Sequence, residues 1–232
     1  MFWPPHCAIC GERTTKFPVC ENCISDMRVE NGCFCPECGN PVDRKGFCEK
    51  HPDAVYPFFV PAFGFNDERQ CTRNLIHLLK YSKRRDIGEF FGEVIIERLA
   101  AEEFIAQADG FVPVPLYKTK ERDRGYNQSE VVAGPICKKT GLPMLSKAVK
   151  RIKCTDSQTK QENAKKRQEN VAGAFQASDE LSGKKVIIID DVITTGATTR
   201  ELAIAIKDVG GSVLCALCIA RPGIDESKES EI

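Results

Sequence analysis

Residues 186–200 read VIIIDDVITTGATTR and decide the fold, because they join an apolar strand, two carboxylates and a hydroxyl-rich turn. The four β-branched residues 186–189 predict a strand buried on both faces, as in a parallel sheet. Asp190 and Asp191 then leave the sheet at the carboxyl end of the strand, where open α/β folds bind ligands. Because N–H groups at a helix start donate to phosphate and carboxylates accept from hydroxyls, the stretch predicts a phosphorylated sugar as ligand.

The same acidic pair allows two other interpretations. Carboxylates after a strand can hold magnesium in a receiver-like domain, or they can cap the following helix. The turn favours the sugar phosphate, because Gly196 permits close backbone approach and the surrounding hydroxyls have no task in the alternatives. The residues expected to hold the ligand are Asp190, Asp191, Thr194, Thr195, Gly196, Ala197 and Thr198.

The N-terminal quarter of the chain is rich in cysteine pairs. The chain has 13 cysteines, and its start lacks the basic segment and apolar run of an export signal, which favours metal binding over disulfides. Four pairs share the spacing of a zinc knuckle. They are Cys7 with Cys10, Cys20 with Cys23, Cys35 with Cys38, and Cys48 with His51.

Four pairs predict two tetrahedral zinc sites. The first two pairs are separated by the same gap as the last two, so we assign one zinc to each half, although a crossed arrangement is the alternative. Residues before 52 hold too little apolar material for an independent core, so both ions are expected to be structural. Cys33 could replace a ligand, whereas Cys215 and Cys218 lie in an apolar run that favours a buried strand.

Length and composition set the domain organisation. A chain of 232 residues with 42% hydrophobic content has room for one α/β core and a small module. The 33 basic and 33 acidic residues cancel, so net charge neither proposes nor excludes a nucleic-acid partner. No apolar stretch approaches the ~20 residues of a membrane helix, and we expect a cytoplasmic protein without an integral membrane segment. The predicted domains are a zinc module at 1–54, a catalytic domain at 55–222 and a disordered acidic tail at 223–232.

Strand and helix patterns alternate after the cysteine module. This alternation predicts a mostly parallel sheet flanked by helices. The expected strands are 110–114, 147–153, 185–189 and 213–220, with an edge strand or connector at 55–65. The expected helices are 67–82, 87–108, 129–140 and 198–209.

Residues 186–200 resemble the 5-phosphoribosyl-1-pyrophosphate (PRPP) motif of type I phosphoribosyltransferases. Other segments narrow the resemblance to the ComF family, which includes ComFC and GntX proteins and carries an N-terminal double zinc ribbon. They are the cysteine pairs, LIHLLKY at 75–81, VPVPLYKTKERDRGYNQSE at 112–130, TDSQT at 155–159 and KRQENVAGAF at 166–175. The resemblance covers nearly the whole chain and leaves out the tail from residue 223 onward.

The resemblance implies a type I phosphoribosyltransferase fold and transfer of a pentosyl group from PRPP with Mg²⁺. Asp190 and Asp191 would accept from the ribose hydroxyls and oppose positive charge on the ring, while Gln158 would belong to a catalytic lid at 153–161. The implied pyrophosphate-binding residues are Pro115, Leu116, Lys118, Arg122 and Arg124. A family link to DNA uptake in natural competence implies the competence helicase ComFA, other competence proteins and single-stranded DNA as partners.

Two points leave the function open. The chain ends about a dozen residues after its last predicted strand, too soon for the hood that holds a nucleobase in related enzymes, so we expect the acceptor pocket within 52–80. Lys80 and Tyr81 match the family there, but could equally be ordinary surface. The alternative function is a non-catalytic adaptor that binds single-stranded DNA and senses PRPP, and a bare metal-stabilised scaffold is a third.

Overall fold

The computed structural model describes residues 5–15, 18–44, 46–65, 67, 69–99, 101–154 and 171–222. Its centre is a six-stranded sheet with the order β2-β1-β3-β8-β7-β4. The strands are β1 (Cys33–Phe34), β2 (Pro41–Val42), β3 (Phe59–Gly64), β4 (Gly110–Pro113), β7 (Lys185–Val192) and β8 (Ser212–Arg221). The pairs β3–β8, β8–β7 and β7–β4 are parallel, as the alternation of elements predicted.

The apolar run of β7 is buried on both faces of the sheet. Ile187 and Ile189 belong to one hydrophobic core, whereas Val186 and Ile188 belong to a second core on the opposite face. This alternation follows from the two-residue period of a strand. The strand continues to Val192, so the acidic pair lies within its buried end rather than beyond it, which corrects the predicted strand end.

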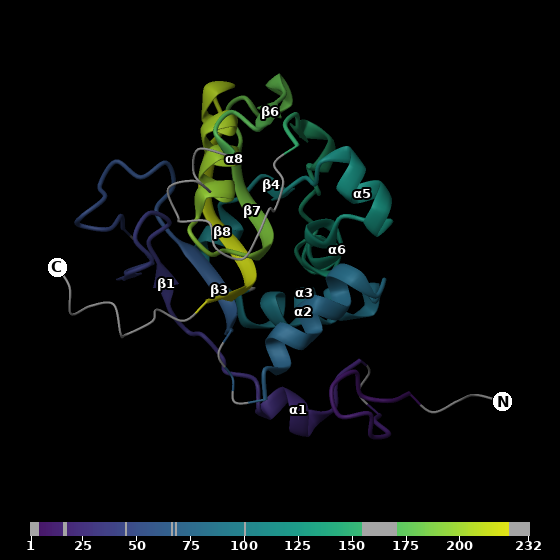
Figure 1. Ribbon diagram of the computed structural model, residues 1–232. Helices are drawn as coiled ribbons and strands as arrows, with labels where there is room; N and C mark the ends of the chain where they lie inside the picture. Colours follow the sequence, from purple (N-terminus) through teal and green to yellow (C-terminus); the bar gives the residue numbers. More distant parts are fainter. Residues whose placement is uncertain are drawn as a thin grey trace, which may run out of the picture.

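Helices cover both faces of the sheet. The first core contains residues of α2 (Cys71–Tyr81), α3 (Arg85–Leu99) and α6 (Gln128–Thr140), and the second contains residues of α8 (Ala197–Asp208). Figure 1 shows α2, α3 and α6 grouped apart from α8. Turn residues fix the helix ends, because Asn127 caps α6 by accepting from the Ser129 N–H and Gly141 ends it at a φ of 75°.

Several elements differ from the sequence prediction. The predicted edge strand at 55–65 is β3, which is completely buried and has neighbours on both sides. The predicted helix at 87–108 is divided into α3 and the short α4 (Glu103–Ala106). Lys118–Arg124, where no helix was predicted, forms the helix α5, and β5 (Val149–Arg151) pairs with β6 (Phe175–Ala177) outside the main sheet. Short 3-10 turns at Ser146–Ala148 and Asp179–Leu181 flank this small sheet.

The two halves of the N-terminal region lie in different places. The first half contains α1 (Glu21–Ser25), and its residues Cys7, Cys23 and Met27 enter the core that contains α2 and α3. The second half contributes β1, which pairs antiparallel with β3. Figure 1 shows α1 below the body and β1 beside β3. The main sheet therefore contains strands from both sides of the predicted boundary at residue 54. The domain boundaries themselves stay a prediction.

The packing of α3 on α6 depends on a glycine. A Cβ at Gly92 would meet the backbone oxygen of Val132 at 2.2 Å, so α3 and α6 approach too closely for any side chain there. Gly92→Ala is expected to lower the free energy of unfolding by about 2–4 kcal/mol in denaturant titration. Gly134→Ala on α6 is the control, because its Cβ would meet nothing within 4 Å and helix propensity predicts a gain of about 1 kcal/mol. Equal effects of the two changes would contradict this packing.

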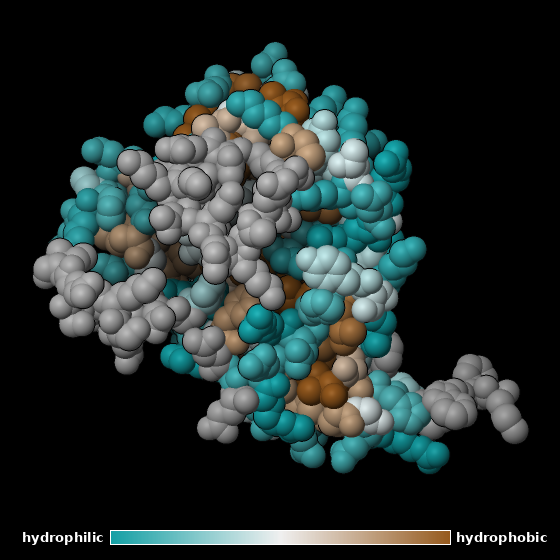
Figure 2. Space-filling view, viewed as in Figure 1, coloured by the Kyte–Doolittle hydropathy of each residue, from teal (hydrophilic) through white to brown (hydrophobic). Residues whose placement is uncertain are grey.

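One face of the molecule is mainly polar. Outside the grey atoms, the face in Figure 2 is largely hydrophilic, with smaller hydrophobic areas between the hydrophilic ones. Among the helices in the described part of the chain, none combines the length and the apolar character needed to cross a membrane.

Candidate functional site

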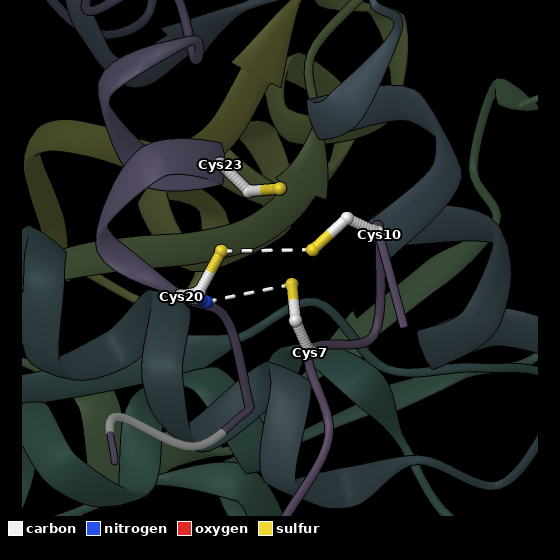
Figure 3. A group of neighbouring side chains, drawn as sticks. All are labelled: Cys7, Cys10, Cys20 and Cys23. Atoms are coloured by element: carbon white, nitrogen blue, oxygen red, sulfur yellow. Dashed lines mark hydrogen bonds between the residues drawn. The ribbon is translucent and has the colours of Figure 1, made fainter. Parts of the chain in front are cut away.

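The first cysteine group gathers at the outer end of the helical layer. Cys7, Cys10, Cys20 and Cys23 turn their sulfur atoms toward one point, with all four within 4.8 Å of one another (Figure 3). Cys10 Sγ lies 3.7 Å from Cys20 Sγ, and the N–H groups of Ile9 and Cys20 donate to Cys7 Sγ at 3.4 Å. Backbone N–H groups aimed at a sulfur stabilise its thiolate form, which is the form that binds metal.

The second group gathers Cys35, Cys38, Cys48 and His51, again with ligand atoms within 4.8 Å of one another. Cys38 Sγ lies 3.8 Å from Cys48 Sγ, and Cys35 Sγ lies 3.7 Å from His51 Nδ1. The structure thus joins the pairs in sequence order and not in the crossed arrangement. Cys33, the possible substitute ligand, is buried in β1 and belongs to neither group.

Both groups fit zinc. Tetrahedral Zn–S bonds of about 2.3 Å place two sulfur atoms about 3.8 Å apart, which agrees with the separations of 3.7 and 3.8 Å. A disulfide would require about 2.05 Å, and all 13 cysteines are free thiols. Each group supplies a full set of four protein ligands, which is the composition of a structural zinc site rather than a catalytic one.

The acidic pair occupies the buried end of β7. Asp190 Oδ1 accepts from the Asp191 N–H at 2.8 Å and from the Ser129 hydroxyl at 3.4 Å. Burial and the neighbouring Asp191 carboxylate raise the pKa of Asp190 to about 7. Lys80 and Arg151 act in the opposite direction but do not cancel the effect of burial. Near neutral pH the site can therefore hold or release a proton at Asp190.

Lys80, which the sequence left undecided, contacts the acidic pair. Its Nζ lies 3.0 Å from Asp191 Oδ2, and the carboxylate is largely buried. Lys80 lies in the last turn of α2, far from β7 in sequence, and the family segment was the signal that could have identified it. Next to it, Tyr81 is 67% exposed, its ring lies 4.8 Å from that of His77, and Arg124 Cζ lies 5.7 Å from the Tyr81 ring centroid.

The hydroxyl-rich turn follows β7 and begins α8. Gly196 is the N-cap of α8 with a φ of 70°, a conformation that glycine adopts without strain. Thr194 and Thr195 are exposed, whereas Gly196 and Ala197 are buried. A small hollow is lined by Asp190 and the residues 192–199, so Asp190 and the turn share one site, whereas Asp191 does not line it. The Thr199 hydroxyl lies 2.6 Å from the Tyr56 hydroxyl and donates to the Gly196 carbonyl. These buried contacts hold the turn in place.

The segment RGYNQS connects three parts of the site. The Asn127 side-chain amide donates to the Val114 carbonyl at 3.0 Å, and the Ser129 hydroxyl reaches Asp190. The Tyr126 hydroxyl donates to the carbonyl of Leu79, beside Lys80. These side chains are buried, so they position the loop after β4, the acidic pair and the end of α2 relative to one another.

The predicted pyrophosphate residues lie on the loop 114–117 and on α5. Pro115 and Leu116 are half-buried, Arg124 contacts Gln128, and Lys118 is exposed. Arg122 is 80% exposed, and its Nε lies 3.8 Å from the carboxylate of its neighbour Asp123. Gln158 and the acidic tail lie outside the described residues.

Comparison with known proteins agrees with both parts of the chain. The double zinc ribbon domain matches residues 1–51, and the phosphoribosyl transferase domain matches residues 118–231. DNA utilization protein YhgH of Escherichia coli K12 is 29% identical over 210 residues, with 88% of this chain and 90% of that protein covered. Competence protein F of Haemophilus influenzae is 28% identical (88% and 85% covered), and competence protein ComFC of Bacillus subtilis is 24% identical (83% and 79%). The chain therefore resembles the ComF proteins over most of its length, with a double zinc ribbon domain followed by a phosphoribosyl transferase domain.

Proposed function

We propose that this protein binds PRPP with Mg²⁺ and transfers its phosphoribosyl group during the handling of imported DNA. The observation that carries the proposal is the hollow at the end of β7, in which the buried Asp190 adjoins the turn at the start of α8, next in sequence to the buried Asp191. The phosphoribosyl transferase match and the relatives named for competence and DNA utilization support the same conclusion.

Each group in and beside the hollow has a task in this reaction. N–H groups of the turn and the threonine hydroxyls bind the 5-phosphate, because the helix start carries partial positive charge. Asp190 and Asp191 accept from the ribose hydroxyls and oppose the positive charge that develops on the ring as the bond from C1 to pyrophosphate breaks. Mg²⁺ bound with the substrate supplies charge neutralisation for the pyrophosphate. Lys80, 3.0 Å from Asp191, balances the acidic pair before the substrate binds.

The binding test is isothermal calorimetry with PRPP and Mg²⁺. Thr195→Val keeps the shape of an exposed turn residue but removes one hydroxyl donor to the phosphate, and is expected to weaken PRPP binding about tenfold. Thr15→Val removes an exposed hydroxyl in the zinc ribbon and should leave the affinity unchanged. Wild-type protein that binds no PRPP would refute the proposed function, and pyrophosphate release measured in parallel separates turnover from binding alone.

The second candidate is an adaptor that binds single-stranded DNA and senses PRPP. The observation that favours it is an exposed basic surface on the small sheet, where Lys147, Lys150 and Lys153 surround Ile152, which is 51% exposed. Phosphate contacts by these lysines would make the affinity fall steeply with salt. DNA affinity that stays flat between low and high salt contradicts this candidate, and PRPP binding without pyrophosphate release favours it over the transferase.

A further inference from the structure

The second zinc group lies directly against the phosphate-binding turn. A Cβ at Gly196 would sit 2.2 Å from the carbonyl oxygen of Pro36, which lies between the zinc ligands Cys35 and Cys38. No side chain fits at Gly196, so the backbone of the zinc knuckle is in contact with the backbone of the turn. Because closely packed protein interiors transmit displacements, the position of the zinc knuckle limits how far the turn can move.

The neighbouring residue adds a charge contact to the same place. The Glu37 N–H donates to Cys35 Sγ at 3.4 Å, and its carboxylate lies 3.4 Å from Arg200 on the first turn of α8. One residue thus touches a zinc ligand through its backbone and the ligand-binding helix through its side chain. Thr199, one position before Arg200, is held from the other side by the fully buried Tyr56.

The first zinc group has no comparable position. Cys7 and Cys23 enter the core beneath α2 and α3, whereas Phe34 and Tyr56 beside the second group enter the core that contains α8 and Ile193. The chain has therefore placed one of its two zinc groups against the hollow and the other away from it.

We propose that the second zinc knuckle is the outer wall of the phosphate-binding turn, so that zinc at Cys35, Cys38, Cys48 and His51 and PRPP at the turn stabilise each other. This inference rests on the proposed PRPP function. Coupling of this kind is reciprocal: zinc loss weakens PRPP binding, and bound PRPP raises the affinity for zinc by the same factor. Coupling between two sites typically amounts to about 5- to 150-fold in affinity.

The first experiment separates the effect of the contact between Glu37 and Arg200 from the effect of zinc binding. Glu37→Ala keeps all zinc ligands but removes the contact with Arg200, so amide hydrogen exchange in residues 193–200 should become about two- to fivefold faster. PRPP binding by calorimetry should weaken by a similar factor. Glu49→Ala is the matched control, because Glu49 is exposed in the other knuckle of the same zinc group and should change neither quantity. Unchanged exchange and affinity in Glu37→Ala would contradict a role for Glu37 in the wall.

The second experiment addresses the metal itself. Cys38→Ser replaces an exposed ligand of the second group, and zinc release to a chromophoric chelator should accelerate together with exchange in residues 193–200, by about tenfold or more. PRPP added to wild-type protein should slow zinc release from this group. Zinc loss without any change in exchange at 193–200 would overturn the proposal. Protein that shows the exchange coupling but binds no PRPP would instead overturn the proposed function, so the two failures are distinguishable.

Discussion

Replacing Asp190 and Asp191 together with asparagine is expected to weaken PRPP binding by about 100-fold or more. Each carboxylate offers charged acceptors to ribose hydroxyls, and hydrogen bonds of this kind contribute about 1.5–3 kcal/mol each, or about 3–6 kcal/mol for the pair. Every 1.4 kcal/mol corresponds to about a tenfold change in affinity. Calorimetry with PRPP and Mg²⁺ measures the loss.

The single change Asp190→Asn is expected to stabilise the folded protein at alkaline pH. Burial, followed by the charge of Asp191, raises the pKa of Asp190 to about 7 from an ordinary value of 3.8. The folded state therefore holds this proton more tightly than the unfolded state, and the contribution of Asp190 to stability is lost as pH rises from about 4 through about 7. Asp190→Asn removes this loss. It should raise the free energy of unfolding by about 1–3 kcal/mol at pH 8 and leave it unchanged at pH 4.

Binding and stability should thus respond to pH in opposite directions. PRPP requires the ionised carboxylate, so wild-type affinity should rise between pH 6 and pH 8 while the Asp190 contribution to stability falls. Asp208→Asn, an exposed aspartate at the far end of α8, is the control for both measurements. Full PRPP affinity in the double variant would refute the assigned role of the acidic pair. An Asp190→Asn variant that is less stable than the wild type at pH 8 would show that burying the ionised Asp190 carboxylate does not destabilise the protein.

Zinc removal is expected to have the largest effect on stability. Zinc binding contributes about 10–16 kcal/mol to folding in isolated zinc-finger peptides, and the sulfur atoms of Cys7 and Cys23 here lie at the edge of the main core. Chelation should therefore lower the free energy of unfolding by at least about 5 kcal/mol and the Tm by about 10–20 °C. Native mass spectrometry should count two zinc ions before chelation, and calorimetry should follow Tm.

Cysteine variants localise the effect. Cys23→Ser should reproduce much of the loss of Tm, because it removes a buried ligand of the first group. Cys154→Ser changes an exposed cysteine outside both groups and should leave Tm unchanged. Metal-free protein that unfolds at the same temperature as the zinc-loaded protein would contradict a structural role for both ions.

Sequence analysis succeeded where the signal is local. The run 186–200 contains its strand, acidic pair and turn in order, and the zinc knuckles keep a fixed spacing, so neither depends on knowing the fold. Contacts between distant segments could not be predicted this way. The approach of Lys80 to Asp191 and of Pro36 to Gly196 depends on where α2 and the second knuckle dock. Similarly, β3 contains Pro61, a residue typical of edge strands, but β1 pairs with β3 from the zinc ribbon and makes it internal.

The continuity of the sheet into the zinc ribbon also affects how the chain can be divided. Residues Arg28 and Glu30 hydrogen-bond to β3 through their backbones, and Phe34 pairs with Phe59 farther along the strand. Without that cover, β3 would present an open row of amides and carbonyls flanked by apolar side chains, the arrangement that recruits further strands into aggregates. The N-terminal segment therefore covers an edge of the sheet that the rest of the chain would otherwise expose, and we expect the two parts not to be separable without loss of solubility.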